Sequence, residues 1–306
     1  MMPRIALAAA VASLLTAAFV TTSVAQQPPV PAPAPSDKVI VEGISPEEAV
    51  RSFIDEVSAA PPGRNLARWD RKVCVGAINL ATRSAQRLID QVSTVAISVG
   101  LEAGEPGCHP DVLILAYSDG DALATRLVKD RFRSFRPDSD STQLGQAALS
   151  RFRTAHTPVR WWHVSQTIAA DGGQASLGDP AFPALGDSIY NVHEASRLRI
   201  NVREEMAHVI IVLDTTLIGK TPFASLADYV AMVALAQIDA KADTHEFPTI
   251  LNLFAAETGE REARMTQWDL DYLKALYEAR GDAARPAGQE REIAGEMLKR
   301  EPKSAN

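Results

Sequence analysis

The sequence lacks the short motifs that identify the commonest hydrolases, redox proteins and calcium-binding proteins. Its 306 residues contain no Gly-x-Ser-x-Gly, no Cys-x-x-Cys and no acidic calcium loop. The histidines also lack the spacing of metal ligands, at positions 109, 156, 163, 193, 208 and 245. We therefore predict no catalytic residues, no metal site and no cofactor.

Positive charge is also scarce, with 31 Lys and Arg residues against 38 Asp and Glu residues. Removal of a leader that contains Arg4 leaves 30 basic and 38 acidic residues, a net charge of −8. An acidic chain does not attract nucleic acid or an anionic membrane electrostatically. We expect neither as a partner.

Long apolar runs are absent except at the N-terminus, where residues 1–25 have the pattern of a secretory signal peptide. Arg4 precedes an apolar run, and small residues precede a cleavage site between Ala25 and Gln26. An uncleaved anchor is the alternative, although the apolar run is short for a membrane span. We expect a periplasmic or secreted protein with no membrane span after cleavage.

Beyond this leader, the chain divides by composition. Residues 26–37 hold five prolines, which predict an extended linker. Helical and strand patterns then alternate over 38–281, which predicts one α+β domain with a mixed sheet covered by helices. Two packed lobes, 38–170 and 190–281, are the alternative. We expect 282–306 to be a charged, solvated and flexible tail.

Only two cysteines are present, Cys74 and Cys108. In a secreted protein two cysteines most often form a disulfide. Closing a loop of about 35 residues in this way is worth roughly 3 to 4 kcal/mol. A catalytic pair of Cys108 with His109 is the weaker alternative, because adjacent side chains rarely reach hydrogen-bond geometry.

Aromatic residues cluster in one predicted strand, residues 157–168. Trp161, Trp162 and His163 could line a ligand groove there, although core packing is the commoner explanation for such a cluster. The preceding residues, 133–154, are polar and charged, and we expect a surface loop at 137–141.

The strongest pattern runs from Ala207 to Asp239. Val209–Leu213 predicts a strand buried on both faces, and Thr221 with Pro222 predicts the N-cap and first position of a long apolar helix. Gly219-Lys220-Thr221 is similar to the end of a phosphate-binding loop. Asp214 stands where that loop requires glycine, which excludes the motif.

Ser225–Leu235 resembles the active helix of zincin metallopeptidases, which usually reads small-Leu-Ala-His-Glu-x-x-His-x-x-Leu. Met265–Tyr277 is similar to the closing segment of that class, so the resemblance covers about residues 207–280. It implies a zincin-like fold. Zincins bind their substrates by adding a strand to a sheet edge, so it also implies a peptide groove.

The zinc-binding residues of that class are missing from this helix. Asp228 stands in the place of the first histidine, Tyr229 in that of the general-base glutamate, and Met232 in that of the second histidine. A lone carboxylate and a thioether do not hold zinc. We therefore expect an emptied cleft, lined by Ser225, Asp228, Tyr229, Met232 and His208.

Our first hypothesis is a secreted, non-catalytic zincin-like pseudoenzyme that binds an unknown peptide or protein. One alternative is a metal-dependent hydrolase whose ligands come from dispersed positions, namely His193, Glu194, His208, Asp228 and His245. Another is a structural component of the cell envelope.

Overall fold

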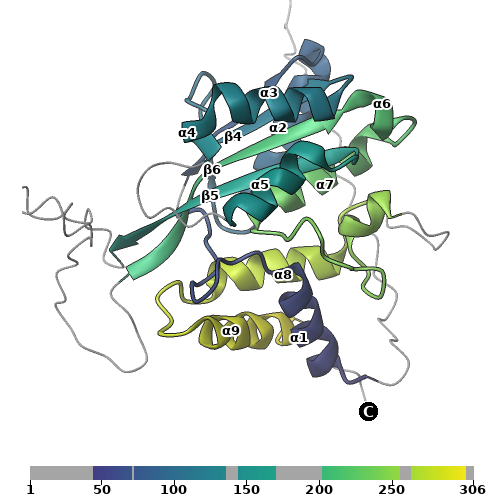
Figure 1. The fold of residues 1–306 in the computed structure, drawn as a ribbon. Helices are drawn as coiled ribbons and strands as arrows, with labels where there is room; N and C mark the ends of the chain where they lie inside the picture. The colour runs from purple at the N-terminus through teal and green to yellow at the C-terminus, as the bar shows by residue number, and fades with distance from the viewer. Residues whose placement is uncertain (1–43, 71, 136–143, 170–201, 256–262, 301–306) are drawn as a thin grey trace, which may run out of the picture. The chain divides into compact units, whose positions relative to one another are not determined.

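The computed structural model describes residues 44–70, 72–135, 144–169, 202–255 and 263–300. Within these residues a mixed four-stranded sheet and a two-stranded sheet are surrounded by helices, as predicted for an α+β protein (Figure 1). The signal peptide, the Ala25–Gln26 cleavage site and the linker lie outside them. No described helix has both the length and the apolar character that a membrane span requires.

The four-stranded sheet has the order β2-β4-β6-β5, in which the first three strands are parallel and β5 is antiparallel to β6. Strand β6 is buried over Val209–Leu213, as its continuous apolar run predicted. Strands β2 and β5 are therefore the two edges of the sheet. The bounds are Val75–Ile78 for β2, Val112–Tyr117 for β4, Val159–Ala169 for β5 and Val202–Asp214 for β6.

A smaller parallel sheet pairs β1 (Lys72–Val73) with β3 (Glu102–Ala103). Cys74 separates β1 from β2. Cys74 forms the expected disulfide with Cys108, with 6.1 Å between their Cα atoms. Gly104 lies against this bond, and a Cβ there would come within 2.5 Å of the Cys108 sulfur, so only glycine fits.

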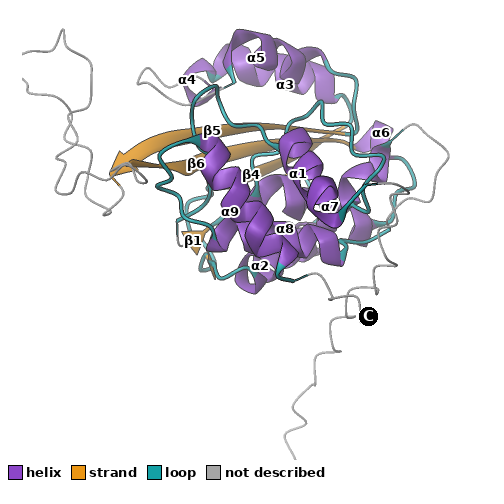
Figure 2. Cartoon of the chain, turned by 90° about the horizontal axis from the view of Figure 1, so that it is seen from below, coloured by secondary structure: helices purple, strands orange, loops and turns teal. Residues whose placement is uncertain are grey.

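The larger core lies on one face of the four-stranded sheet (Figure 2). Ser45 and Glu48 form a capping box at the start of its first helix. Phe53 from that helix makes edge-to-face contacts with Trp268 and Tyr272. The helices on this face are α1 (Pro46–Val57), α2 (Thr82–Ser98), α7 (Phe223–Leu235), α8 (Gln267–Glu278) and α9 (Pro286–Leu298).

A smaller core lies on the opposite face, under α3 (Gly120–Asp130), α4 (Phe132–Phe135) and α5 (Gly145–Thr154). The predicted surface loop at 137–141 lies outside the described residues, and the polar segment that follows it forms α5. The polar residues of this helix face outward, while Ala148, Leu149 and Phe152 form a narrow apolar stripe that packs on the sheet.

The prediction of a solvated, flexible tail over residues 282–306 is wrong for the part that forms α9. Its Ile293, Ala294 and Met297 are buried in the larger core. The amide of Gln289 accepts from the N–H of Leu66 at 2.6 Å and donates to its carbonyl at 3.1 Å. This helix is amphipathic, and its charged residues lie on the outer side.

The two lobes considered from the sequence share one sheet, because β6 lies between β4 and β5. A short helix, α6 (Thr215–Ile218), joins β6 to α7, and a 3-10 helix spans Ile250–Phe254. Thr221 does not cap α7 as predicted. Pro222 occupies the N-cap, and the Thr221 hydroxyl donates to the carbonyl of Ile218, which closes the preceding turn.

Candidate functional site

We expected helix α7 to line an emptied active site, but other parts of the chain cover its polar residues. Every residue from Ser225 to Leu235 is buried. The Asp228 carboxylate accepts from the side chain of Gln91 at 2.6 Å, from Nε of Arg264 at 2.6 Å, and from the N–H of Met265 at 2.9 Å. These partners come from α2 and from the segment before α8, so they cover the helix on this side.

The predicted cleft residues therefore separate into three groups. Ser225, Asp228 and Met232 are buried against neighbouring elements and are not among the residues that line the cavity described below. Tyr229 does line a cavity, described below. His208 bonds through Nε2 to the carbonyl of Ser134 at 2.6 Å, on the face of the sheet opposite α7.

The dispersed metal ligands of the alternative hypothesis do not come together. His208 and Asp228 lie on opposite faces of the sheet, and His245 is exposed and bonds to Asp243 at 2.6 Å. His193 and Glu194 lie outside the described residues. Within the described ranges no three His, Cys, Asp or Glu side chains are placed to share a metal ion.

The outer edge of β5 presents main-chain groups away from the sheet. The N–H of Asp214 donates to the carbonyl of Pro158, and the N–H of Val209 donates to that of Asp111, each at 2.9 Å. Because the main-chain groups of an antiparallel strand alternate in direction, those of Val159, Trp161 and His163 point away from β6. No described strand pairs with this side.

A cavity of about 350 Å³ lies along this edge, and we call it the β5 groove. Its floor is the strand itself, from Val159 to His163. One wall comes from α5 and the residues after it, including Leu144, Ala148, Arg151, Phe152 and Ala155. The other wall is Tyr229 and the segment Ile238–Lys241.

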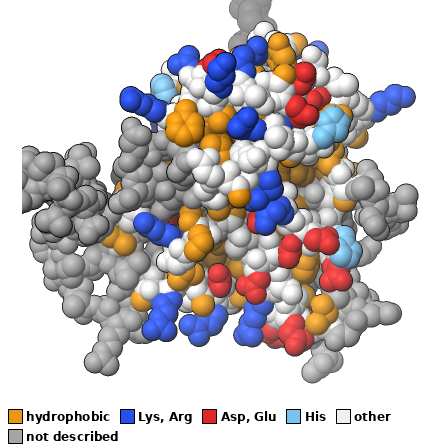
Figure 3. All heavy atoms as spheres, viewed as in Figure 1, with side chains coloured by type: hydrophobic (Ala, Val, Ile, Leu, Met, Phe, Trp, Pro, Cys, Tyr) orange, Lys and Arg blue, Asp and Glu red, His pale blue; other side chains and the backbone are white. Residues whose placement is uncertain are grey.

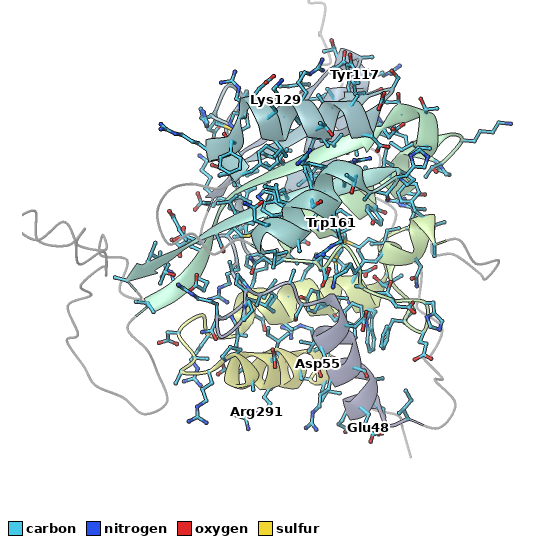
Figure 4. All side chains as sticks on the ribbon, viewed as in Figure 1. Glu48, Asp55, Tyr117, Lys129, Trp161 and Arg291 are labelled. Atoms are coloured by element: carbon cyan, nitrogen blue, oxygen red, sulfur yellow. A yellow bond between two sulfur atoms is a disulfide. The ribbon has the colours of Figure 1, made fainter. Side chains whose placement is uncertain are left out.

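The sequence suggested either core packing or a ligand groove for the aromatic cluster in β5, and the cluster is found in both settings. Trp161 donates through Nε1 to the carbonyl of Ile238 at 2.9 Å, and Trp162 donates to that of Phe135 at 3.0 Å, so both rings are anchored in the two cores. Trp161 lies between α5 and the helices of the other face (Figure 4). The strand that carries the rings also borders the groove.

His163 and Tyr229, which line the groove, are neutral. Burial lowers the pKa of His163 to about 4, so at neutral pH its Nε2 donates a hydrogen to the carbonyl of Val233, at 2.8 Å. Burial also raises the pKa of the Tyr229 hydroxyl. The Tyr229 ring meets Trp161 edge to face at 6.0 Å between centroids. This part of the groove suits binding better than proton transfer at neutral pH.

Three basic side chains line the groove. Arg160 is buried and donates to the carbonyl of Phe152 at 3.2 Å and to the Asp121 carboxylate, which lowers the pKa of Asp121. Its Nε has no hydrogen-bond partner among the described residues. Arg151 and Lys241 are exposed at the two walls.

Comparisons with protein-family models, with curated proteins and with solved structures found no match. Sequence reasoning identified Tyr229 and the aromatic strand, but it missed Arg151, Ala155 and Lys241. These residues follow no motif, and only the packing of α5 and of the segment after α7 brings them beside β5.

Proposed function

We propose that this protein is a secreted, non-catalytic, zincin-like binding protein that holds an extended peptide or protein segment in the β5 groove. The observation that carries the proposal is the outward edge of β5 at Val159, Trp161 and His163, which faces a cavity. An extended segment that adds a strand to a sheet edge gains main-chain hydrogen bonds, and its side chains enter flanking pockets.

The zincin resemblance supports the same surface. Helix α7 follows β6 and lies beside the antiparallel edge strand, as its contact through His163 and Val233 indicates. In zincins the substrate adds to a sheet edge, and such a groove can remain when the metal is lost. Asp228, in place of the first zinc ligand, is occupied by Arg264 and Gln91.

In binding by strand addition, main-chain hydrogen bonds would provide affinity, and the side chains of the ligand would provide specificity. The N–H and carbonyl of Trp161 would donate to and accept from the ligand backbone. Alternate ligand side chains would then face the α5 wall or the wall made by Tyr229 and Ile238–Lys241. The Cys74–Cys108 disulfide is consistent with the oxidising compartment in which such a protein would act.

Cavity-filling variants test the proposal. A library of immobilised, acetylated and amidated random hexapeptides is incubated with the wild-type protein, with Ala155→Trp and Ala240→Trp, and with the control Ala147→Trp. Ala155 and Ala240 line the groove, whereas Ala147 is exposed on α5 outside it. Circular dichroism establishes that each variant is folded.

We expect the wild-type and Ala147→Trp proteins to capture the same peptides. The two groove variants should lose at least tenfold in affinity, since an indole fills the space that the ligand needs. Capture of no peptide by the wild-type protein would contradict the proposal, and so would equal capture by all four proteins.

A further inference from the structure

The charge of the β5 groove is opposite to that of the chain. The whole sequence has a net charge of −7, but the groove is lined by three basic side chains and one acidic side chain. These are Arg151, Arg160, Lys241 and Asp239. Basic side chains also lie beside apolar surface on the face that carries α5 (Figure 3). A basic groove on an acidic protein favours acidic ligands at that place, because opposite charges attract.

The three basic side chains differ in their hydrogen bonds and ion pairs. Arg160 is held by Asp121 and by the end of α5, and its buried Nε has no described partner. Arg151 forms no hydrogen bond or ion pair through its side chain with any described residue. Lys241 reaches Asp239 only at 3.9 Å. Arg151 and Lys241 are therefore available to a ligand, since a contact of that length is weak and exposed.

These two cations lie on opposite walls. Arg151 belongs to α5, and Lys241 to the segment after α7. A strand added along β5 directs successive side chains alternately to the two walls. Each wall also offers apolar surface next to its cation, from Ala148 and Phe152 on one side and Ile238 on the other.

We infer that the β5 groove selects peptides that carry a carboxylate next to apolar residues. The carboxylate is an acidic side chain or the carboxyl terminus of the ligand, and Arg151 or Lys241 pairs with it. This inference rests on the proposed function, because it names the class of peptide that the groove accepts.

The test uses two random hexapeptide libraries, one amidated and one with free carboxyl termini. Both are captured by the wild-type protein and by the double variant Arg151→Gln with Lys241→Gln. The control variant, Arg51→Gln with Lys129→Gln, removes the same charge from exposed positions on α1 and α3. Sequencing of captured peptides gives the frequency of Asp and Glu relative to the input.

The wild-type and control proteins should enrich acidic peptides from the amidated library, or prefer the free-carboxyl library if the terminus is the ligand group. The double variant should lose this selection, with affinity for acidic peptides about tenfold lower and for neutral peptides unchanged. Retained selection in the double variant would overturn the inference, as would equal capture of acidic, neutral and basic peptides by the wild-type protein. Failure to capture any peptide would instead overturn the proposed function.

Discussion

The two edges of the four-stranded sheet differ in length and in what lies beside them. Strand β2 has four residues, begins next to the Cys74–Cys108 disulfide and is followed by Asn79, which has a φ of 62°. Pro110 packs so closely on it that a Cβ at Gly76 would lie 2.6 Å from the ring. Strand β5 has eleven residues, and the groove runs along its outer side.

Short edge strands resist pairing with other chains, whereas a long edge strand offers a template for another strand. The disulfide and Pro110 fix β2, so this edge contributes stability. The outward main-chain groups of β5 at Trp161 and His163 face a cavity, so this edge is suited to binding. The comparison assigns structure to one edge and recognition to the other, and the following variants test that division.

The largest effect is expected at the β2 edge. Replacing Cys74 and Cys108 together by Ser should lower the free energy of unfolding by about 3 to 4 kcal/mol, because the unfolded chain gains the entropy of an open loop. Urea denaturation at pH 7 measures this loss. The folded variant should keep its peptide affinity, and a loss of affinity equal to that of the groove variants would break the division between the edges.

The ion pair at Asp228 comes next. Arg264→Met removes the cation that pairs with a carboxylate that is 1% exposed. It should cost about 3 kcal/mol of unfolding free energy, because the hydrogen bonds from Gln91 and from the Met265 N–H do not replace the ion pair of this buried charge. Adding Asp228→Asn removes that charge and should restore part of the lost unfolding free energy. Urea denaturation measures both changes. No recovery in the double variant would contradict a structural role for this pair, and peptide binding should not change in either protein.

An effect that appears only in acid is expected at His163. Its pKa is about 4 in the folded protein and near 6.5 in the unfolded chain, so the unfolded chain binds more protons between these values. The stability that neutral His163 contributes is therefore present above pH 6.5 and is lost as the pH falls toward 4. The loss should approach about 3 kcal/mol.

The measurement compares the unfolding free energies of the wild type and His163→Gln from pH 7 to pH 4. Burial raises the pKa of Asp269 to about 6, so its contribution changes in the opposite direction over this range, but both proteins share it. The difference between them isolates His163. A difference that stays constant with pH would contradict the lowered pKa, because His163 would then bind protons equally in the folded and unfolded chains.

Features with local signals could be predicted from the sequence. The aromatic strand at 157–168 and the apolar run at Val209–Leu213 depend on neighbouring residues, and both are present in the structure, as β5 and β6. The disulfide followed from the number of cysteines. Composition alone did not reveal α5 and wrongly suggested a flexible tail at α9. The narrow apolar stripes of both helices are surrounded by charged residues.

The candidate site depended on contacts between distant segments. Asp228 was expected in a cleft because nothing near it in the sequence shows that Gln91 and Arg264 cover it. The groove forms only when β5 takes the edge position beside β6 and two separate segments flank it. Tyr229 lines the β5 groove through its contact with Trp161, and this contact also depends on the packing of α7 against β5.

The central claim is that the outer edge of β5 binds an extended ligand, and main-chain amide exchange tests it directly. Hydrogen exchange is followed by NMR for residues 159–163, with and without a hexapeptide selected from the library. Strand addition predicts that the peptide slows exchange at the outward amides of Trp161 and His163, with little change at Arg160 and Trp162, whose amides already face β6. Unchanged exchange at Trp161 and His163 in the presence of bound peptide would contradict the claim.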